Sequence, residues 1–465
     1  AGLALGRTPY RVVCAARVPD LILNLMRAMR SASTRRHPVR VACLLSACVS
    51  LTTIAGCGDK TPTGEGPYAE LVAEFVPKIE KETGLSFKTP PTIASRTRED
   101  VGKFVRQQLE SDRARTQLAG QESAYKLLGM MPDTMNLLAL LQKLLEEQIV
   151  GYYDPATKVL YVVDGAAPAL LRQTVSHELV HALQDQYVKI DSVQAQVDNA
   201  DRQSAAQAVL EGQAVLLQLR MDPSAGPMLK MPGGWDRIRD AMKDAQTGMP
   251  VFSAAPRVVR EGLLFPYLGG ADFVRRFIQK RPEKELLLDL PISTKQILND
   301  AAYFTDSNTT RDLPVTVTLP APRTGTVLYS NSVGEFETRL LLVQHLKDEA
   351  LARRGASGGD GDQFAVVRTA NGDAFVWATA WDSAVDAADF LDLMGDAARR
   401  RYELARIDFP SGATARQYDV PSKGARPART VTLKLERVNG QPVVLYMDRP
   451  AKIGAALLDL AGITV

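Results

Sequence analysis

Three residues suited to metal and hydrolytic chemistry lie together in residues 174–183, Thr-Val-Ser-His-Glu-Leu-Val-His-Ala-Leu. Residues four apart in a helix are about 40° apart around its axis, so His177 and His181 would project from one face. Their ring nitrogens could then share one tetrahedral ion, and imidazole suits zinc. Glu178 lies one position further round, near enough to reach a water on such an ion but not to be an equal third ligand. The His-Glu-x-x-His spacing therefore predicts a zinc site with Glu178 as its base.

The neighbouring residues argue against chance histidines on a polar helix surface. Histidine is rare in the chain, with 4 among 465 residues, so two at this spacing are improbable by chance. Leu179, Val180, Ala182 and Leu183 make the segment too apolar for a solvent-exposed helix. We therefore expect a buried helix that presents its polar side chains to one site.

A zinc site that performs chemistry needs a third protein ligand and an open fourth position. No further histidine lies nearby, so we expect a carboxylate on a following helix. Glu211 is a lone acid in the small and apolar segment 208–214, where a charge is costly unless it is paired or bound to a metal. Gly212 and Ala214 would let that helix approach the metal helix closely. Two alternatives stay open: Glu211 is a salt-bridged or surface residue, or the ligand is Glu261, whose arginine neighbours offer it an ordinary ion pair.

The motif at residues 177–181, followed by Glu211 on a second helix, resembles the gluzincin family of zinc metallopeptidases. The resemblance implies a zincin-like fold, a zinc cofactor, and a protein or peptide substrate. Similar segments occur in a group of poorly characterised bacterial metallopeptidases and span residues 149–273 of this chain; they are residues 177–186, 210–214 and 265–273.

Two positions separate this chain from related families. Metzincins carry a histidine six residues after the second ligand and a glycine three residues after it, whereas this chain has Tyr187 and Gln184 there, which excludes that class. Thermolysin-like gluzincins carry an aspartate four residues after the ligand glutamate, and that position is Val215 here. Asp185, one turn after His181, could replace this aspartate as a partner of the ligands, or it could be a solvated helix residue.

Hydrolysis also needs a hydrogen-bond donor for the developing oxyanion. Tyr267 follows the two metal helices and is our candidate, with a core tyrosine as the alternative. His345 is a weaker candidate because it falls on a predicted surface helix. The sequence has no G-x-G-x-x-G motif and no P-loop, so we expect no nucleotide partner.

The apolar periodicity predicts an α+β protein in which helices must position these residues. The mainly helical part contains a small hairpin of residues 149–153 and 159–163. Its predicted helices cover residues 68–81, 98–109, 111–130, 135–148, 168–188, 201–220, 236–246 and 261–279, with a loop at 224–235. A small α+β sandwich should follow, with a strand at 326–329, a helix at 335–350, a loop at 355–361, and hairpins through Asn371-Gly372 and Asn439-Gly440. Between these hairpins Ser383 and Asp386 are typical of a helix N-terminus.

Charge separates the first 56 residues from the rest. The chain carries 56 basic and 53 acidic residues, for a net charge of +3. Eight of the arginines and one aspartate precede Cys57, so the remainder is slightly acidic. This balance argues against a nucleic-acid partner. All four cysteines lie at or before Cys57, so no disulfide or cysteine metal site is expected in the folded body.

The leader resembles that of a bacterial lipoprotein. A basic stretch is followed by an apolar stretch, residues 41–54, and then by Ala55-Gly56-Cys57. The apolar stretch is shorter than the roughly 20 residues that span a membrane, which disfavours a plain transmembrane anchor. We expect signal cleavage before Cys57, lipidation of Cys57, and a flexible tether at residues 57–67. The predicted division is then a leader at 1–56, the tether, a zincin-like metallopeptidase domain at 68–319 and an α+β domain at 320–465.

Two functions follow from these features. The first is a zinc peptidase anchored to the cell envelope through its N-terminal lipid, with an extended substrate pairing along one strand of the 149–163 hairpin. The alternative is an inactive zincin scaffold that serves as a binding module of the cell envelope. Residues 68–148 could also act as a propeptide.

Overall fold

The computed structural model describes residues 14–15, 68–148, 150–190, 198–246, 248–305, 312–454 and 457–465. Cys57 and the predicted tether at 57–67 lie outside the described residues. Within the described part of the chain, no helix combines the length and the hydropathy that a membrane span requires.

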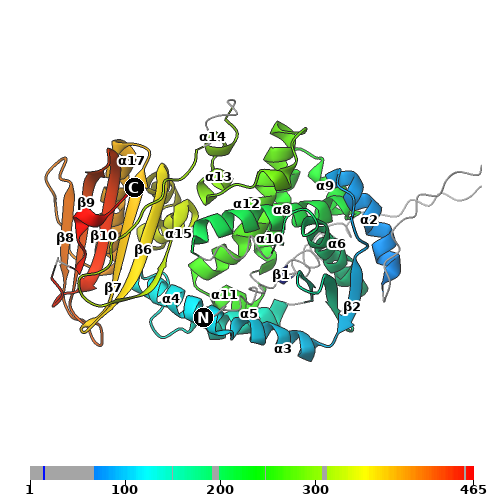
Figure 1. Cartoon of the computed structure of the whole chain (residues 1–465), viewed down its shortest axis with the longest axis horizontal. Helices are drawn as coiled ribbons and strands as arrows, with labels where there is room; N and C mark the ends of the chain where they lie inside the picture. Colours follow the sequence, from blue (N-terminus) through cyan, green and yellow to red (C-terminus); the bar gives the residue numbers. More distant parts are fainter. Residues whose placement is uncertain are drawn as a thin grey trace, which may run out of the picture.

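The chain has an α+β fold. A six-stranded antiparallel sheet lies at one end of the long axis, and most of the helices lie toward the other end, around a small sheet (Figure 1). The first helices match their predictions within three residues at each end; they are α2 (Ala69–Thr83), α3 (Arg98–Leu109), α4 (Asp112–Leu127) and α5 (Leu137–Gln148).

The small sheet contains the predicted hairpin. Its strands β3 (Gly151–Asp154) and β4 (Val159–Val163) are antiparallel, with Tyr153 opposite Leu160. The sheet also has two outer strands that the sequence did not predict. β2 (Thr92–Arg96) runs parallel to β4, and β1 (Cys14–Ala15) runs antiparallel to β3. The order is therefore β1-β3-β4-β2.

Three long helices follow: α6 (Pro168–Gln184), α8 (Ala200–Met221) and α12 (Arg257–Lys280). Ala214 packs with Val175 and Leu179 of α6, as predicted. Gly212 instead faces α12, where a Cβ atom would lie 2.1 Å from the carbonyl carbon of Gly270. The prediction that Gly212 lets α8 approach the metal helix is therefore wrong, and this glycine permits the crossing of α8 and α12.

The predicted loop at 224–235 contains a short helix, α9 (Ala225–Leu229), and the start of α10 (Gly234–Gln246). Asp222 stabilises the start of α9 because its Oδ1 accepts from the backbone N–H groups of Ser224 and Ala225. Short elements complete this part of the chain: α11 (Pro250–Ala254), η1 (Leu286–Leu288), α13 (Thr294–Leu298) and α14 (Asp300–Tyr303).

The six-stranded sheet has the order β5-β6-β7-β10-β9-β8, and both Asn-Gly hairpins form as predicted. Its strands are β5 (Thr326–Asn331), β6 (Gly359–Thr369), β7 (Gly372–Trp381), β8 (Ala415–Val420), β9 (Arg429–Val438) and β10 (Gln441–Pro450). The sequence did not predict β8. The predicted loop at 355–361 is wrong, because these residues end one helix and begin β6.

The predicted helix at 335–350 is two helices, α15 (Gly334–Leu346) and α16 (Glu349–Ala356). The chain turns between them at Lys347, which has a φ of 59°. Asp348 then caps α16 by accepting from the backbone N–H groups of Ala350 and Leu351. The helix start at Ser383 is confirmed: α17 (Ala384–Arg401) begins there, and the hydroxyl accepts from Asp386 N.

Helices cover one face of the six-stranded sheet. Phe375 and Trp377 of β7 share a core with residues of α15, α16 and α17, and this core also includes Tyr125 and Leu128 at the end of α4 and Leu137 of α5. The core thus joins residues from both sides of position 319, and the two-domain division stays a prediction. Extended segments that include Val317 and Ile463 cover the other face.

Candidate metal centre

The helix α6 carries the predicted metal ligands through the interior. Pro168 occupies its first turn, and all residues from Gln173 to Gln184 are buried. His177, Glu178 and His181 are at most 1% exposed. The predicted buried helix with inward-facing polar groups is therefore confirmed.

α6 and α8 bring His177, His181 and Glu211 together. The Nε2 atoms of His177 and His181 lie 3.1 Å apart, and Oε2 of Glu211 lies 3.2 Å from the first and 3.3 Å from the second. Three tetrahedral ligand atoms at zinc–ligand distances of about 2.0–2.1 Å would be separated by roughly 3.3 Å. The spacing and the chemistry of this donor set fit a zinc ion.

Glutamine amides hold both imidazoles, a role that was not predicted from the sequence. The Nδ1 of His177 lies 3.1 Å from Oε1 of Gln218, and the Nδ1 of His181 lies 2.8 Å from Oε1 of Gln184. A ring that donates its Nδ1–H to an amide oxygen keeps the Nε2 lone pair for a metal. Helical spacing could have signalled both, because Gln218 follows Glu211 by two turns and Gln184 follows His181 by one.

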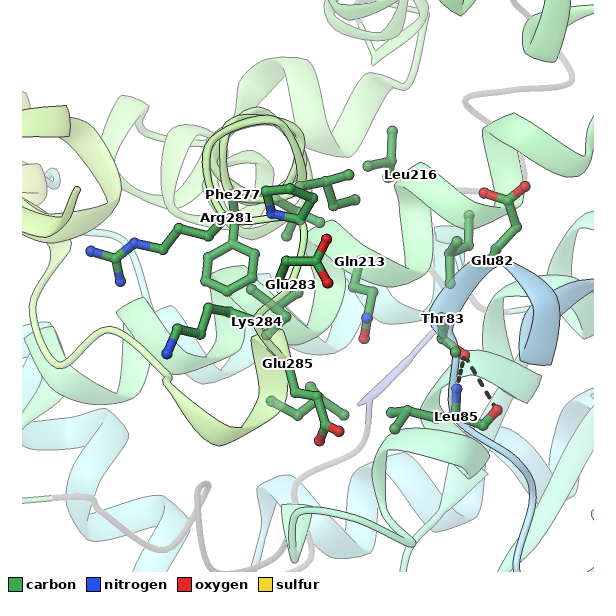
Figure 2. Close-up of a pocket in the computed structure, with 17 residues that line it drawn as sticks. Glu82, Thr83, Leu85, Gln213, Leu216, Phe277, Arg281, Glu283, Lys284 and Glu285 are labelled. Carbon is green, nitrogen blue, oxygen red and sulfur yellow. Dashed lines mark hydrogen bonds between the residues drawn. The ribbon is translucent and has the colours of Figure 1, made fainter. Parts of the chain in front are cut away.

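The amide of Gln213 continues the hydrogen-bonded chain that starts at His181 and Gln184. Nε2 of Gln184 donates to the carbonyl of Leu210 and to Oε1 of Gln213, each at 2.9 Å. Figure 2 shows Gln213 among the residues that line a pocket between the end of α2, α8 and the chain after α12. His181 is thus fixed by hydrogen bonds to a chain of two amides anchored on α8.

Glu178 has a different environment from Glu211. Its Oε2 accepts from the backbone N–H of Tyr153 in β3 at 2.8 Å. Its Oε1 is buried and has no hydrogen-bond partner among the described residues. Burial raises the pKa of Glu178, and the nearby histidines oppose this rise. The carboxyl therefore has one oxygen fixed by the sheet and the other available to a small ligand.

Asp185 holds the strand β3, which contacts Glu178, and does not hold a metal ligand through its side chain. Its Oδ2 accepts from the hydroxyl of Tyr153 at 2.9 Å and from Nζ of Lys158 at 2.5 Å. Its Oδ1 accepts from the backbone N–H of Ile190 at 3.3 Å. The solvated alternative is wrong because the carboxylate is buried. The backbone N–H of Asp185 donates to the carbonyl oxygen of His181, but its carboxylate binds Tyr153, Lys158 and Ile190, so the side chain acts on the site through Tyr153.

The ligand residues polarise one another. Burial favours the neutral form of Glu211, but His181 and His177 outweigh it and lower the pKa of Glu211 far below its usual range. Burial also lowers the pKa of His181, yet Glu211 outweighs this effect and raises that pKa to about 9. The site therefore holds an anionic carboxylate directed at two imidazoles, and a metal ion that binds there would displace the proton of His181.

The other candidates fall at different distances from this centre. Tyr267 is 7% exposed, and its ring lies 6.3 Å from the ring of His177, so it is both a core residue and a neighbour of the site. Glu261 is partly exposed on α12 and does not belong to the ligand group. His345 is partly buried, and its Nε2 lies 2.8 Å from the carbonyl oxygen of Leu128, so it links α15 to the end of α4 instead of serving the site.

A second acidic group does not resemble the first. Asp312, Asp360 and Asp382 lie close together. Nζ of Lys295 lies 2.7 Å from a carboxylate oxygen of both Asp312 and Asp382. A lysine already occupies the position that a cation would take, so we assign this group a structural role.

Comparison with known proteins covers only the C-terminal part of the chain. Residues 325–446 match the model of a family described as a domain of unknown function (DUF8575). This region runs from β5 into β10 and excludes the candidate metal centre. No curated protein and no solved structure matches the chain.

Proposed function

We propose that the protein is a zinc-dependent peptidase, with His177, His181 and Glu211 as metal ligands. The observation that carries this proposal is the environment of Glu178. Its carboxyl lies on the same buried helix as the two histidines. Tyr153 N holds one oxygen, and the other has no partner in the part of the chain that the structure describes. A purely structural carboxylate would be expected to use both oxygens, since an unpartnered buried acceptor is costly.

Each residue of the site has a separate role in the proposed hydrolysis. A bound zinc ion supplies Lewis acidity for the substrate carbonyl and for water. Glu178 takes a proton from the attacking water at Oε1 and passes it to the nitrogen of the leaving amine. Tyr267 is the proposed hydrogen-bond donor to the developing oxyanion, because its ring is a neighbour of His177.

The strand β3 is the proposed surface for an extended substrate. It supplies the N–H that holds Glu178, so a peptide paired with its outer edge would lie close to the base. β1 occupies that edge, with Cys14 opposite Tyr153. Cleavage before Cys57 would remove β1, and the processed protein would then offer the edge to a substrate.

The alternative is a binding module on a zincin scaffold. It is favoured by Val215, which stands where thermolysin-like enzymes have an aspartate, and by the large C-terminal region with no known role. The full chain in detergent, loaded with zinc and incubated with unfolded protein, separates the two functions. We expect cleavage that stops with a zinc chelator and returns with added zinc; a zinc-loaded protein without peptidase activity would favour the binding module.

The proposed location is the cell envelope, through a lipid on Cys57. We expect a radiolabelled fatty acid to enter the wild-type protein in a bacterial host but not Cys57→Ser, because serine offers no thiol for lipid attachment. Cys48→Ser is the matched control and should keep the label. Label retained in Cys57→Ser would contradict lipidation at this residue.

A further inference from the structure

A cavity adjoins the metal-binding helices on the side of Gln218. It has a volume of about 300 Å³ and lies between α2, the N-terminal half of α6 and the end of α8. The proposed ligands His177, His181 and Glu211 do not line it, but Gln218, which binds Nδ1 of His177, does. The lining residues that matter here are Phe75, Ala169, Arg172, Gln218, Met221 and Asp222.

Gln218 separates His177 from this cavity and uses only half of its amide. The side chain is 2% exposed, and its Oε1 accepts from Nδ1 of His177. Its Nε2 is buried and has no acceptor among the described residues. The reversed amide, with Nε2 of Gln218 toward His177, is disfavoured. His177 would then accept this bond through its Nδ1 lone pair and carry its own hydrogen on Nε2, which faces Glu211 and the metal position. Gln218 therefore offers the cavity a buried N–H donor that has no acceptor among the described residues.

The charges around the cavity select the kind of acceptor. Arg172 forms two hydrogen bonds, of 2.6 and 2.7 Å, with the carboxylate of Glu74, so its charge is already paired. Asp222 adds a further negative charge. Lys78 also pairs with Glu74, at 2.8 Å, so two cations and two carboxylates balance here. The surroundings then have no spare cation to pair a buried free carboxylate, and they favour a neutral carbonyl. Phe75 and Met221 offer apolar surface to an aliphatic group beside that carbonyl.

We propose that this cavity binds a neutral peptide segment, whose backbone carbonyl accepts from Nε2 of Gln218 and whose aliphatic side chain packs against Phe75 and Met221. Occupancy strengthens zinc binding. An acceptor on Nε2 polarises the amide, which strengthens the bond from His177 Nδ1–H to Oε1 and holds the imidazole in the orientation that ligates. The orientation of the Gln218 amide and this coupling both rest on the proposed zinc site, because a metal on Nε2 requires His177 to carry its hydrogen on Nδ1.

N-acetyl-leucinamide is the probe, because it has neutral carbonyls and an aliphatic side chain. We expect it to bind the full chain in detergent with one site per chain, measured by calorimetry with and without zinc. At saturation it should tighten zinc binding by about fivefold, and zinc should tighten the probe by the same factor, since linkage is reciprocal. N-acetyl-leucine, which carries a carboxylate, should bind at least tenfold more weakly.

Two variants and one control test the assignment. Gln218→Glu keeps an oxygen for His177 but removes the donor, so zinc binding should remain while probe binding is lost. Ala169→Trp fills the rim of the cavity and should also abolish probe binding, whereas Ala167→Trp, outside the cavity, should not.

The proposal is overturned if wild type binds no probe, if both cavity variants bind it as wild type does, or if N-acetyl-leucine binds equally well. It is also overturned if bound probe leaves zinc affinity unchanged. Loss of zinc binding in wild type with probe binding intact would instead contradict the proposed metal site.

Discussion

At the scale of single residues, the His-Glu-x-x-His spacing identified two ligand candidates and the proposed base, and the lone-acid argument selected Glu211. The partners of those residues were harder to predict. Gln184 and Gln218 are uncharged, so they lack the signal that a lone charge in an apolar segment gave for Glu211. Only their helical spacing from the ligands points to them. The contact of Tyr153 with Glu178 involves a backbone N–H, which any residue type supplies. Such contacts depend on how α6 packs against β3, and only the structure shows this.

The choice between Glu211 and Glu261 leads to a direct prediction. Glu211→Gln should lower zinc affinity by at least a hundredfold, because the amide is a poor ligand and leaves the imidazoles without their anionic partner. Glu261→Gln is the matched control, at a partly exposed position of α12, and should keep one zinc per chain. Equilibrium dialysis with metal analysis measures both. Zinc retained in Glu211→Gln but lost in Glu261→Gln would identify Glu261 as the ligand.

At the scale of elements, the predicted helices that build the site form within a few residues of their expected ends, because their apolar periodicity is strong. The failures occur where a single backbone conformation or cap decides the outcome. Lys347 and Asp348 break one predicted helix into α15 and α16, and Asp222 starts α9 inside a predicted loop. The face on which Gly212 packs was also unpredictable, since a glycine permits close approach on any side.

The crossing of α8 and α12 should control stability. A Cβ atom at Gly270 would lie 1.9 Å from the backbone oxygen of Ala208, so Gly270→Ala must separate the helices. Overpacking usually costs about 1–3 kcal/mol, and we expect at least the upper end because backbone atoms obstruct the methyl group. Gly262→Ala on the same helix meets no atom within 4 Å and should be neutral or stabilising. Thermal unfolding measures both; equal stability of the two variants would contradict this packing.

At the scale of the whole molecule, carboxyl groups are buried where the helical part meets the six-stranded sheet. Oε1 of Glu337 on α15 accepts from the hydroxyl of Tyr125 on α4 at 2.8 Å. Asp201 on α8 accepts from the backbone N–H of Thr294 at 3.0 Å. Burial raises the pKa of each carboxyl to about 7. The sequence could not reveal this junction, because it joins residues more than 90 positions apart.

These raised pKa values predict an unusual dependence of stability on pH. Between about pH 4.5 and 7 the folded chain holds protons that the unfolded chain has released, so the unfolding free energy falls as pH rises. Each group contributes at most about 1.4 kcal/mol per pH unit. Glu337→Gln should remove its share of this slope while Asp201 keeps its own. Urea unfolding at a series of pH values measures the slope, and a wild-type slope retained in Glu337→Gln would contradict the assignment.

The most direct test of the central claim is the paired measurement of zinc content and peptide cleavage in Glu178→Gln. Glutamine keeps the size of the side chain and an oxygen for Tyr153 N, but it removes the basic carboxylate. We predict about one zinc per chain, as in wild type, and cleavage reduced by roughly two orders of magnitude or more. A variant that cleaves as fast as wild type would remove Glu178 from the chemistry. A variant that loses its zinc would make Glu178 a ligand or a structural acid, and would contradict the assignment of His177, His181 and Glu211 as the complete set of protein ligands.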